Sequence, residues 1–441
     1  LNFSHGSAAD QMRRAQEVRA LAGELGLDIG ILADLQGPKI RIESFAAGPI
    51  ELQENQAFAL DTALASKAGD ATQVGCAYKA LPQDVRAGDV LLLNDGAITM
   101  RVDAVTGTRI DCTVLVGGRL SDRKGINKQG GGLSADALTD KDIADLRTAV
   151  ELDVDFIAVS FPRSAADMDT ARRLVTEAGG RCALVAKIER AEALQALSEL
   201  IAASDAVMVA RGDLGVEIGD AELPGWQKRI ISESREQNKM VITATQMMES
   251  MINSPIPTRA EVLDVANAVM DGTDAVMLSA ETASGKYPVK TVEAMVRVCR
   301  GAEASLTITP RRDNQRFDTH FERTDESIAM AATWTARHMH ATAIVALTDS
   351  GATAQMMSRT EALIPIYALT PHERTRRRMA LCRGVFPVAF TPSQIESLIQ
   401  VREAIEVLRY RKVLLDGDRV LITKGDGDGP GGTNSLKIIT V

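Results

Sequence analysis

Short apolar runs that end in a polar residue recur along the first two thirds of the chain. Runs that are apolar on both faces are typical of buried parallel strands. Stretches with a helical period separate them, and two of these begin with a capping box, at Thr139 with Asp142 and at Thr258 with Glu261. This alternation predicts a βα barrel or a doubly wound sheet. The predicted strands are 28–34, 154–160, 182–187, 205–210, 239–243 and 274–279.

Polar side chains that could take part in catalysis or binding lie at the end of each predicted strand. In a barrel these ends converge on one mouth, whereas a doubly wound sheet does not gather successive strand ends around one point. We therefore expect an eight-stranded barrel of the TIM type. The predicted strands and a stub at 1–3 fall short of eight, so the first barrel unit is expected to be missing from the chain. The residues at the strand ends are Asp34, Ser160, Lys187 with Glu189, Arg211 with Asp213, Thr245, and Ser279 with Glu281.

A helix is also predicted after Ser7, and its periodicity indicates which side chains face the core. The residues expected on this face are Ala8, Met12, Ala15, Ala22 and Leu25.

Two regions depart from the alternating pattern. Residues 38–132 contain short β-like runs at 56–60, 90–93, 98–102 and 109–116, with no good helix, which predicts an inserted β-barrel cap domain. Residues 307–441 begin with a charged linker and continue as a small α/β domain. Its predicted strands are 343–347, 365–369, 386–390, 419–423 and 436–441. The barrel domain is then discontinuous, over 1–37 and 133–306.

Composition and charge narrow the class of protein. The chain has 441 residues and a net charge of -9, from 50 basic and 59 acidic residues, which disfavours nucleic acid and anionic membranes as partners. No apolar stretch is long enough to span a bilayer. Five scattered cysteines without a C-x-x-C pair predict reduced thiols and a cytoplasmic protein.

The strongest candidate chemistry lies on two neighbouring strand ends. Glu189 and Asp213 are placed to share one Mg²⁺, and Lys187 points to the same side as Glu189. A cation beside a divalent metal indicates that an anion binds between them. Gly212 permits close approach of the backbone, a short helix beginning near Asp213 would offer N–H groups to an anion, and Thr245 adds a hydroxyl. The competing interpretations are a hydrated barrel rim, an ordinary turn and a structural threonine.

Other phosphate and metal motifs are missing or misplaced. The sequence contains no G-x-x-x-x-G-K-[ST] and no H-E-x-x-H, which argues against a P-loop kinase and a zinc hydrolase. Gly427, Gly429 and Gly432 fit G-x-G-x-x-G, but they precede a predicted strand rather than a helix. A loop is therefore the better interpretation of these glycines.

At these residues the chain resembles pyruvate kinase. The resemblance implies a (β/α)₈ barrel, a mobile cap and a C-terminal effector domain in a homotetramer. It also implies phosphoryl transfer from phosphoenolpyruvate to ADP, giving pyruvate and ATP in the last step of glycolysis, with Mg²⁺ or in its place Mn²⁺. The motifs that carry it are Asn2-Phe3-Ser4-His5-Gly6, Gly37-Pro38-Lys39-Ile40-Arg41, Lys187-Ile188-Glu189, Met208 to Gly215, Ala244-Thr245-Gln246-Met247 and Met277 to Thr282.

The resemblance also implies a role for each matched residue. Lys187 would neutralise the phosphoryl group, Glu189 and Asp213 would bind Mg²⁺, and the Gly212 and Asp213 amides with Thr245 would hold the substrate carboxylate. Thr245 would also lie on the proton path to the enolate. The monovalent-cation site would comprise Asn2, Ser4, Asp34 and the carbonyl of Leu35, and the nucleotide side Asn2, His5 and Arg41.

Three departures from the family pattern carry further expectations. Lys39 stands where potassium-dependent members have glutamate, so we expect little need for K⁺, the alternative being an ordinary salt bridge. The stretch between Glu189 and Asp205 is short enough to suggest a missing loop. Asp349 disfavours fructose 1,6-bisphosphate and leaves a sugar monophosphate or a nucleotide as effector. The effector loop would comprise Thr348, Ser350, Gly351 and Thr353.

Two other functions stay open on the sequence. A metal-dependent aldolase or lyase also uses a Glu and Asp pair at a barrel mouth, but it does not need the cap or the C-terminal domain. A metabolite sensor without activity would keep the effector loop while losing Lys187 or the acid pair, and neither is lost.

Overall fold

The central sheet is parallel throughout and follows the order β1-β10-β11-β12-β13-β14 in the computed structural model. The structure describes residues 1–308, 321–360, 363–394, 396–425 and 432–441. A parallel bridge from Asn2 to Asp34 extends the sheet beyond β1. The curled parallel sheet confirms the predicted barrel class. Its strands are β1 (Leu32–Asp34), β10 (Phe156–Val159), β11 (Ala183–Ile188), β12 (Ala206–Ala210), β13 (Met240–Ala244) and β14 (Ala275–Val276).

The helices follow the strands in the order that the sequence predicts. Both predicted capping boxes are present, since the Thr139 and Thr258 side chains accept the amide hydrogens of Asp142 and Glu261. The helices of this part are α1 (Ala8–Leu25), α3 (Asp140–Glu151), α4 (Ala165–Glu177), α5 (Ala191–Gln195), α6 (Leu197–Ala203), α7 (Arg211–Ile218), α8 (Leu223–Glu236), η1 (Glu249–Ile252), α9 (Arg259–Asp271), α10 (Ala280–Ala283) and α11 (Pro288–Ile308).

Some predicted bounds were wrong. The predicted strands at 28–34 and 274–279 shrink to three and two residues in β1 and β14. The expected gap between Glu189 and Asp205 is not found, because α5 and α6 span this stretch. The Asp205 amide reaches the Leu184 carbonyl at 2.9 Å, so the segment joins β11 to β12 as it stands.

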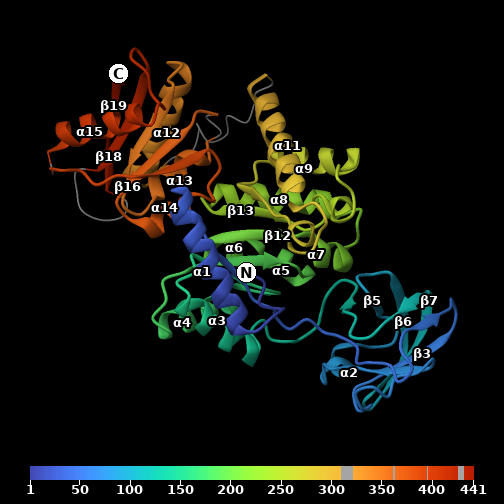
Figure 1. The fold of residues 1–441 in the computed structure, drawn as a ribbon. Coiled ribbons are helices and arrows are strands. Elements are labelled where there is room, and N and C mark those ends of the chain that lie inside the picture. The colour runs from blue at the N-terminus through green and yellow to red at the C-terminus, as the bar shows by residue number, and fades with distance from the viewer. Residues whose placement is uncertain (309–320, 361–362, 395, 426–431) are drawn as a thin grey trace.

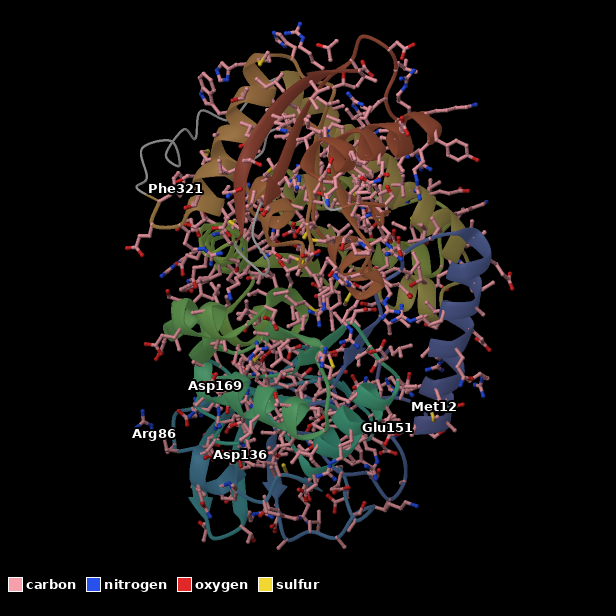
Figure 2. All side chains as sticks on the ribbon, turned by 90° about the vertical axis from the view of Figure 1, so that its left-hand side faces the viewer. Met12, Arg86, Asp136, Glu151, Asp169 and Phe321 are labelled. Atoms are coloured by element: carbon pink, nitrogen blue, oxygen red, sulfur yellow. The ribbon has the colours of Figure 1, made fainter. Side chains whose placement is uncertain are left out.

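The predicted buried face of α1 was partly wrong. Met12 and Leu25 are 41% and 70% exposed, and Figure 2 shows Met12 on the outer side of the molecule. Gln11 is buried instead, because its Nε2 donates to the carbonyls of Asn2 and His5, both at 2.8 Å. Ala8 is exposed as well, so three of the five side chains predicted on the buried face lie outside it.

The alternation of side chains along the strands serves two cores. On β12, Val207 and Val209 pack with the surrounding helices, whereas Ala206 and Met208 face the opposite side. That second core continues into the C-terminal part, where it includes Ile344. The barrel and the C-terminal part therefore share apolar packing.

The strands from β2 to β9 gather at the end of the molecule farthest from the C-terminus (Figure 1). The four strands predicted in this region are present, and their ends lie within a few residues of the predicted ones. The prediction of no good helix did not include one short helical segment, α2 (Leu81–Asp84). The sheets have the orders β4-β3-β7-β6-β5-β9 and β2-β8. The strands are β2 (Ile50–Leu52), β3 (Ala57–Asp61), β4 (Gln73–Gly75), β5 (Val90–Leu93), β6 (Ile98–Thr106), β7 (Arg109–Val116), β8 (Gly118–Leu120) and β9 (Ile126–Lys128).

The C-terminal part is an α/β body with the strand order β17-β16-β15-β18-β19, which confirms its predicted class. Most of the charged linker, together with Gly427 and Gly429, lies outside the described residues. The elements are α12 (Thr324–His338), β15 (Ala343–Leu347), α13 (Ala352–Ser358), β16 (Ile366–Thr370), α14 (Glu373–Met379), β17 (Val385–Ala389), α15 (Ser397–Tyr410), β18 (Arg419–Gly425) and β19 (Thr433–Thr440).

Two buried ion pairs join the C-terminal part to the barrel. Arg377 on α14 meets Asp155, just before β10, at 2.9 Å. Arg359 meets Asp274, just before β14, at 2.7 Å, and both side chains are almost fully buried. Both acids precede barrel strands, so these contacts lie at the end of the barrel opposite its mouth.

Candidate active site

Lys187 occupies the centre of the barrel mouth. It lies near the end of β11, and its Nζ is 3.0 Å from Asp34 Oδ1, 3.1 Å from Glu189 Oε1 and 2.8 Å from Ser160 Oγ. Burial opposes the charged form of Lys187, but the Glu189 and Asp34 carboxylates outweigh it and hold its pKa above the ordinary value. The mouth therefore contains a fixed, fully protonated ammonium group.

Glu189 is a deeply buried carboxylate of the mouth, with 3% of its surface exposed. Its Oε2 accepts the Phe161 amide hydrogen at 2.9 Å. Burial raises the pKa of Glu189 to about 7, Lys187 opposes that rise, and the charges of Asp213 and Asp34 add to it. The group is thus close to the point where a bound cation decides whether it is ionised.

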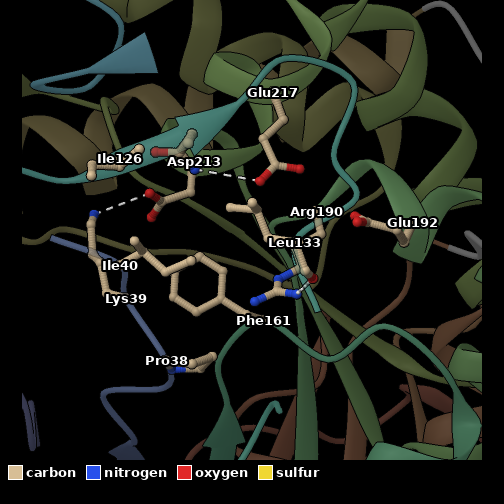
Figure 3. Close-up of a pocket in the computed structure, with 11 residues that line it drawn as sticks. Pro38, Lys39, Ile40, Ile126, Leu133, Phe161, Arg190, Glu192, Asp213 and Glu217 are labelled. Carbon is tan, nitrogen blue, oxygen red and sulfur yellow. Dashed lines mark hydrogen bonds and ion pairs between the residues drawn. The ribbon is translucent and has the colours of Figure 1, made fainter. Parts of the chain in front are cut away.

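Asp213 lies in the first turn of α7, beside the first chain crossing from barrel to cap. Lys39 Nζ is 3.0 Å from Asp213 Oδ1 (Figure 3). It is also 3.9 Å from Asp95 of the cap. The ordinary salt bridge that was the alternative for Lys39 is therefore present. Its nearest partner is Asp213 rather than the residues assigned to the monovalent cation.

The donor set at the mouth fits Mg²⁺ and not a metal that needs a full set of protein ligands. No group of three or more His, Cys, Asp or Glu side chains suited to a metal occurs among the described residues. Glu189 and Asp213 nevertheless interact through their charges. Two oxygen-donor carboxylates, with substrate oxygens and water in the remaining positions, match the preference of Mg²⁺.

Thr245 follows β13 in a left-handed conformation, with φ of 67°, and Gln246 has φ of 54°. This conformation is strained for a β-branched residue. The buried side chain of Arg211 holds it in place, since its Nη2 donates to the Thr245 carbonyl at 2.6 Å. Thr245 Oγ1 in turn accepts the Gly212 amide hydrogen at 2.9 Å. The predicted partners Gly212 and Thr245 are thus in contact.

The predicted helix near Asp213 is present but begins earlier, at Arg211, because the chain turns directly out of β12. Gly212 and Asp213 therefore lie in its first turn. Their N–H groups have no partner within the helix there, although the Gly212 N–H already donates to Thr245 Oγ1. Such N–H groups in the first turn of a helix are suited to bind an anion.

The residues assigned to the monovalent cation lie together, and several of their polar groups contact other groups of the protein. Asn2 pairs with Asp34 as a parallel bridge, and Asn2 Oδ1 accepts the Ser4 amide hydrogen at 2.8 Å. The Leu35 carbonyl accepts the Ser160 hydroxyl at 2.7 Å. Asp34 already faces the Lys187 ammonium, so a positive charge is present at this group.

The residues assigned to the nucleotide lie at the edge of the mouth. His5 is exposed in the turn before α1. Arg41 lies on the cap side of the crossing, where its Nη1 donates to the Arg123 carbonyl at 3.0 Å. The structure does not bring these two side chains into contact with each other.

The assigned effector loop turns tightly in front of α13. Gly351 has φ of 85°, and its amide donates to Thr348 Oγ1 at 3.0 Å. Ser350 is exposed, whereas Thr353 is buried and its hydroxyl meets Thr433 Oγ1 at 2.7 Å. Thr353 thus faces inward and is not free to meet a ligand.

The structure adds a group of residues that the sequence did not single out. Phe161, Arg190, Glu192 and Glu217 line the cleft beside Asp213 (Figure 3). The Arg190 guanidinium lies 5.6 Å from the Phe161 ring centre and donates to the Leu133 carbonyl at 3.1 Å. The sequence offered one signal for these residues, which is that they lie just after strands β10 and β11 or within α7.

The fold and the site define a barrel enzyme with a buried lysine held between two carboxylates at its mouth. Comparison with protein families agrees: residues 1–292 match the model "Pyruvate kinase, barrel domain", and residues 326–439 match "Pyruvate kinase, alpha/beta domain". The chain belongs to the pyruvate kinase family. It is therefore a phosphotransferase.

Curated relatives match over the whole chain. Pyruvate kinase II of Salmonella typhimurium is 52% identical over 100% of this chain and 92% of the relative. Pyruvate kinase of Haemophilus influenzae is 51% identical over the same shares, and that of Mycobacterium intracellulare is 41% identical over 99% and 91%. Among the described residues, no helix combines the length and the apolar character that a membrane span requires.

Proposed function

We propose that this chain transfers the phosphoryl group of phosphoenolpyruvate to ADP, giving pyruvate and ATP, as the final step of glycolysis. The observation that carries the proposal is the Lys187 ammonium, held at the mouth by Asp34 and Glu189 at 3.0 and 3.1 Å. A rigid cation at this point stabilises charge on a phosphoryl group in transit without reorganising during the reaction.

The two carboxylates Glu189 and Asp213 would hold Mg²⁺, with Mn²⁺ as a substitute, and the bound ion would supply charge neutralisation between the transferred group and the site. Glu189 must be ionised for this role. Its pKa of about 7, raised by burial and opposed by Lys187, makes ionisation near neutral pH depend on that lysine.

The carboxylate of phosphoenolpyruvate would bind at the start of α7. Gly212 and Asp213 offer their amide hydrogens there, and Thr245 lies beside them. In the structure the Gly212 amide donates to Thr245 Oγ1, so substrate would take over this hydrogen bond. The Thr245 hydroxyl, which donates to the Ala244 carbonyl at 2.6 Å, would turn from that carbonyl to join the proton path to the enolate carbon.

The cap would close over the mouth and keep water from the phosphoryl group. Pro38 and Lys39 lead into the cap, and Phe161 and Leu133 give the neighbouring cleft an apolar wall. His5 and Arg41 would meet the nucleotide from the edge of the mouth. Asn2 would also lie on the nucleotide side, and Arg41 would take part in catalysis as well as in nucleotide binding.

A coupled assay for pyruvate tests the proposal directly. We expect pyruvate only when phosphoenolpyruvate, ADP and Mg²⁺ are all present. Pyruvate formation independent of ADP would favour the aldolase or lyase interpretation. Absence of any activity in the intact protein, with phosphoenolpyruvate binding retained, would favour a sensor.

We also propose that Lys39 replaces the charge that K⁺ supplies in potassium-dependent members. Its ammonium lies 3.0 Å from Asp213, a residue of the proposed substrate site. The Asn2, Ser4, Asp34 and Leu35 site would then be retained without being needed. Assays in tetramethylammonium buffer with and without K⁺ test this, and Lys39→Glu should restore stimulation. Strong K⁺ stimulation of the unaltered enzyme would disprove the substitution.

Regulation and assembly complete the proposal. A sugar monophosphate or a nucleotide would bind Thr348, Ser350 and the Gly351 turn of the C-terminal domain, and Asp349 would disfavour a bisphosphate. The domains would be 1–37 with 133–306, 38–132 and 307–441, assembled as a homotetramer. The described cysteines are all free, which supports work in the reducing cytoplasm. Activation profiles with sugar phosphates and AMP, and the mass in solution, test these points.

A further inference from the structure

Both chain crossings between barrel and cap are fastened to the same helix, α7. The first crossing contributes Lys39, whose Nζ is 3.0 Å from Asp213 Oδ1. The second crossing follows β9 and contains three successive glycines, all with positive φ, at 130–132. There the Gly130 amide donates to the Glu217 carbonyl at 3.0 Å, and Asn127 Nδ2 donates to Glu217 Oε1 at 3.4 Å.

Glu217 is built into this junction from both sides. It is 4% exposed, and its other carboxylate oxygen accepts the Ala191 amide hydrogen of α5 at 2.9 Å. One buried side chain therefore connects the cap strand β9 with the barrel helix α5. A buried carboxylate satisfied by two donors from different parts of the chain holds those parts in a fixed relation.

Glu192 of α5 and Arg190, which directly precedes α5, also contact the second crossing. Glu192 accepts the Gly132 amide hydrogen, and a Cβ at Gly131 would lie 2.6 Å from Glu192 Oε2. Arg190 donates to the Leu133 carbonyl at 3.1 Å. We call Arg190, Glu192 and Glu217 the hinge clasp, and Figure 3 shows all three on one side of the cleft.

The clasp connects to the proposed site through α7, and also through Arg190, which directly follows Glu189 and lies over the Phe161 ring. Helix α7 has eight residues, with Asp213 in its first turn and Glu217 four residues later. Residues four apart lie about 6 Å apart along a helix axis and on the same face. A displacement of Glu217 is therefore transmitted to Asp213 and to the Gly212 amide as a rigid-body movement.

We propose that Glu217 is a positioning residue, which couples the position of the cap to the position of Asp213 by fastening the second cap crossing to α7. Closure of the cap would then move α7 and align Asp213 and the Gly212 amide for substrate. This inference rests on the proposed reaction, because it assigns the alignment to substrate and metal held at Asp213.

Several charged groups surround Glu217. Glu192 of α5 and Arg190, which directly precedes α5, act on it, Asp213 lies on its own helix, and Lys128 of β9 is paired with Asp89 at 3.0 Å. Burial raises the pKa of Glu217 to about 7, the Ala191 amide opposes this, and Glu192 adds to it. The carboxylate thus lacks a fully compensating cation, and its hydrogen bonds to Asn127 and Ala191 carry the contact.

The test uses Glu217→Gln and Asn127→Ala, alone and together, in the full chain, with Glu199→Gln as a control. Glutamine has one acceptor oxygen where the carboxylate has two, so one of the two donors loses its partner. Glu199 is exposed on the neighbouring helix α6. We expect each clasp variant to lower kcat/KM for phosphoenolpyruvate about tenfold and to raise the Mg²⁺ half-saturation, with the double variant no worse than either single one.

Hydrogen exchange provides a readout that needs no turnover. In the protein without substrate, amides at 127–133 should exchange about tenfold faster in Glu217→Gln, and not in Glu199→Gln. Unchanged exchange would overturn the clasp. Faster exchange with unchanged kcat/KM and Mg²⁺ half-saturation would reduce Glu217 to a structural role and overturn the coupling. An unaltered enzyme that makes no pyruvate would instead disprove the proposed reaction, and the exchange result would still decide the clasp.

Discussion

Replacing Lys187 by methionine tests the centre of the proposed mechanism. The substitution keeps most of the apolar stem of the side chain and removes the ammonium that lies 3.0 Å from Asp34 and 3.1 Å from Glu189. A phosphoryl oxygen bound beside this ammonium would lie at a similar distance. Two unit charges about 4 Å apart interact by about 4 kcal/mol at an effective dielectric constant near 20. Losing this interaction in the transition state alone should lower kcat by about 10³.

The same variant should change how the site binds metal. Lys187 opposes the rise in the pKa of Glu189, so its removal leaves that pKa further above its ordinary value than about 7. A metal ion then competes with a proton for the Glu189 carboxylate over a wider range of pH. Mn²⁺ binding, followed by electron paramagnetic resonance, should persist in Lys187→Met with its pH midpoint moved upward.

Lys239→Met is the matched control. Lys239 precedes β13 at the opposite end of the barrel, where its Nζ donates to the carbonyls of Ala202 and Ser204 at 3.1 and 2.6 Å. This variant should lower stability without a comparable loss of kcat. A loss below tenfold in folded Lys187→Met, or an equal loss in both variants, would refute the role given to Lys187.

Three further perturbations follow from the structure. Gly131→Ala places a Cβ 2.6 Å from Glu192 Oε2 at a φ of 79°, so kcat/KM should fall about tenfold. Adding Glu192→Ala to this variant should restore part of kcat/KM. Full activity of Gly131→Ala alone would contradict the close contact. The Glu217 pKa is raised from 4.5 to about 7, so folding favours its protonated form, and the stability it contributes is present below pH 4.5 and lost as pH rises through about 7. This loss amounts to about 3 kcal/mol of unfolding free energy, and Glu217→Gln should lack it when urea unfolding is measured as a function of pH. Parallel pH curves of unfolding free energy for the two proteins would refute the raised pKa of Glu217. Asp274→Asn leaves the buried Arg359 without its charge partner and should cost about 3 to 5 kcal/mol, seen as earlier thermal unfolding of the barrel with the C-terminal part; an unchanged midpoint would show that the pair is dispensable.

The strand order and the position of the mouth were predictable because both depend on local patterns. A run such as 205–210 is apolar on both faces wherever it folds, and Arg211 and Asp213 necessarily follow its end. The same reasoning identified the inserted β body and the C-terminal α/β body. It failed on the face of α1, where Gln11 is buried through hydrogen bonds to distant carbonyls. Apolar periodicity contains no information about such partners.

The residues near the mouth could be named from the sequence, because each lies at or just after the end of a recognisable strand. They are Lys187, Glu189, Asp213 and Thr245. The contacts among them depend on the folded arrangement. The left-handed turn at Thr245 depends on Arg211, and the contact of Glu217 with the cap joins residues that lie 90 positions apart. Strand ends are set by short-range alternation, whereas contacts between side chains depend on sheet register, helix placement and burial. These are properties of the whole fold.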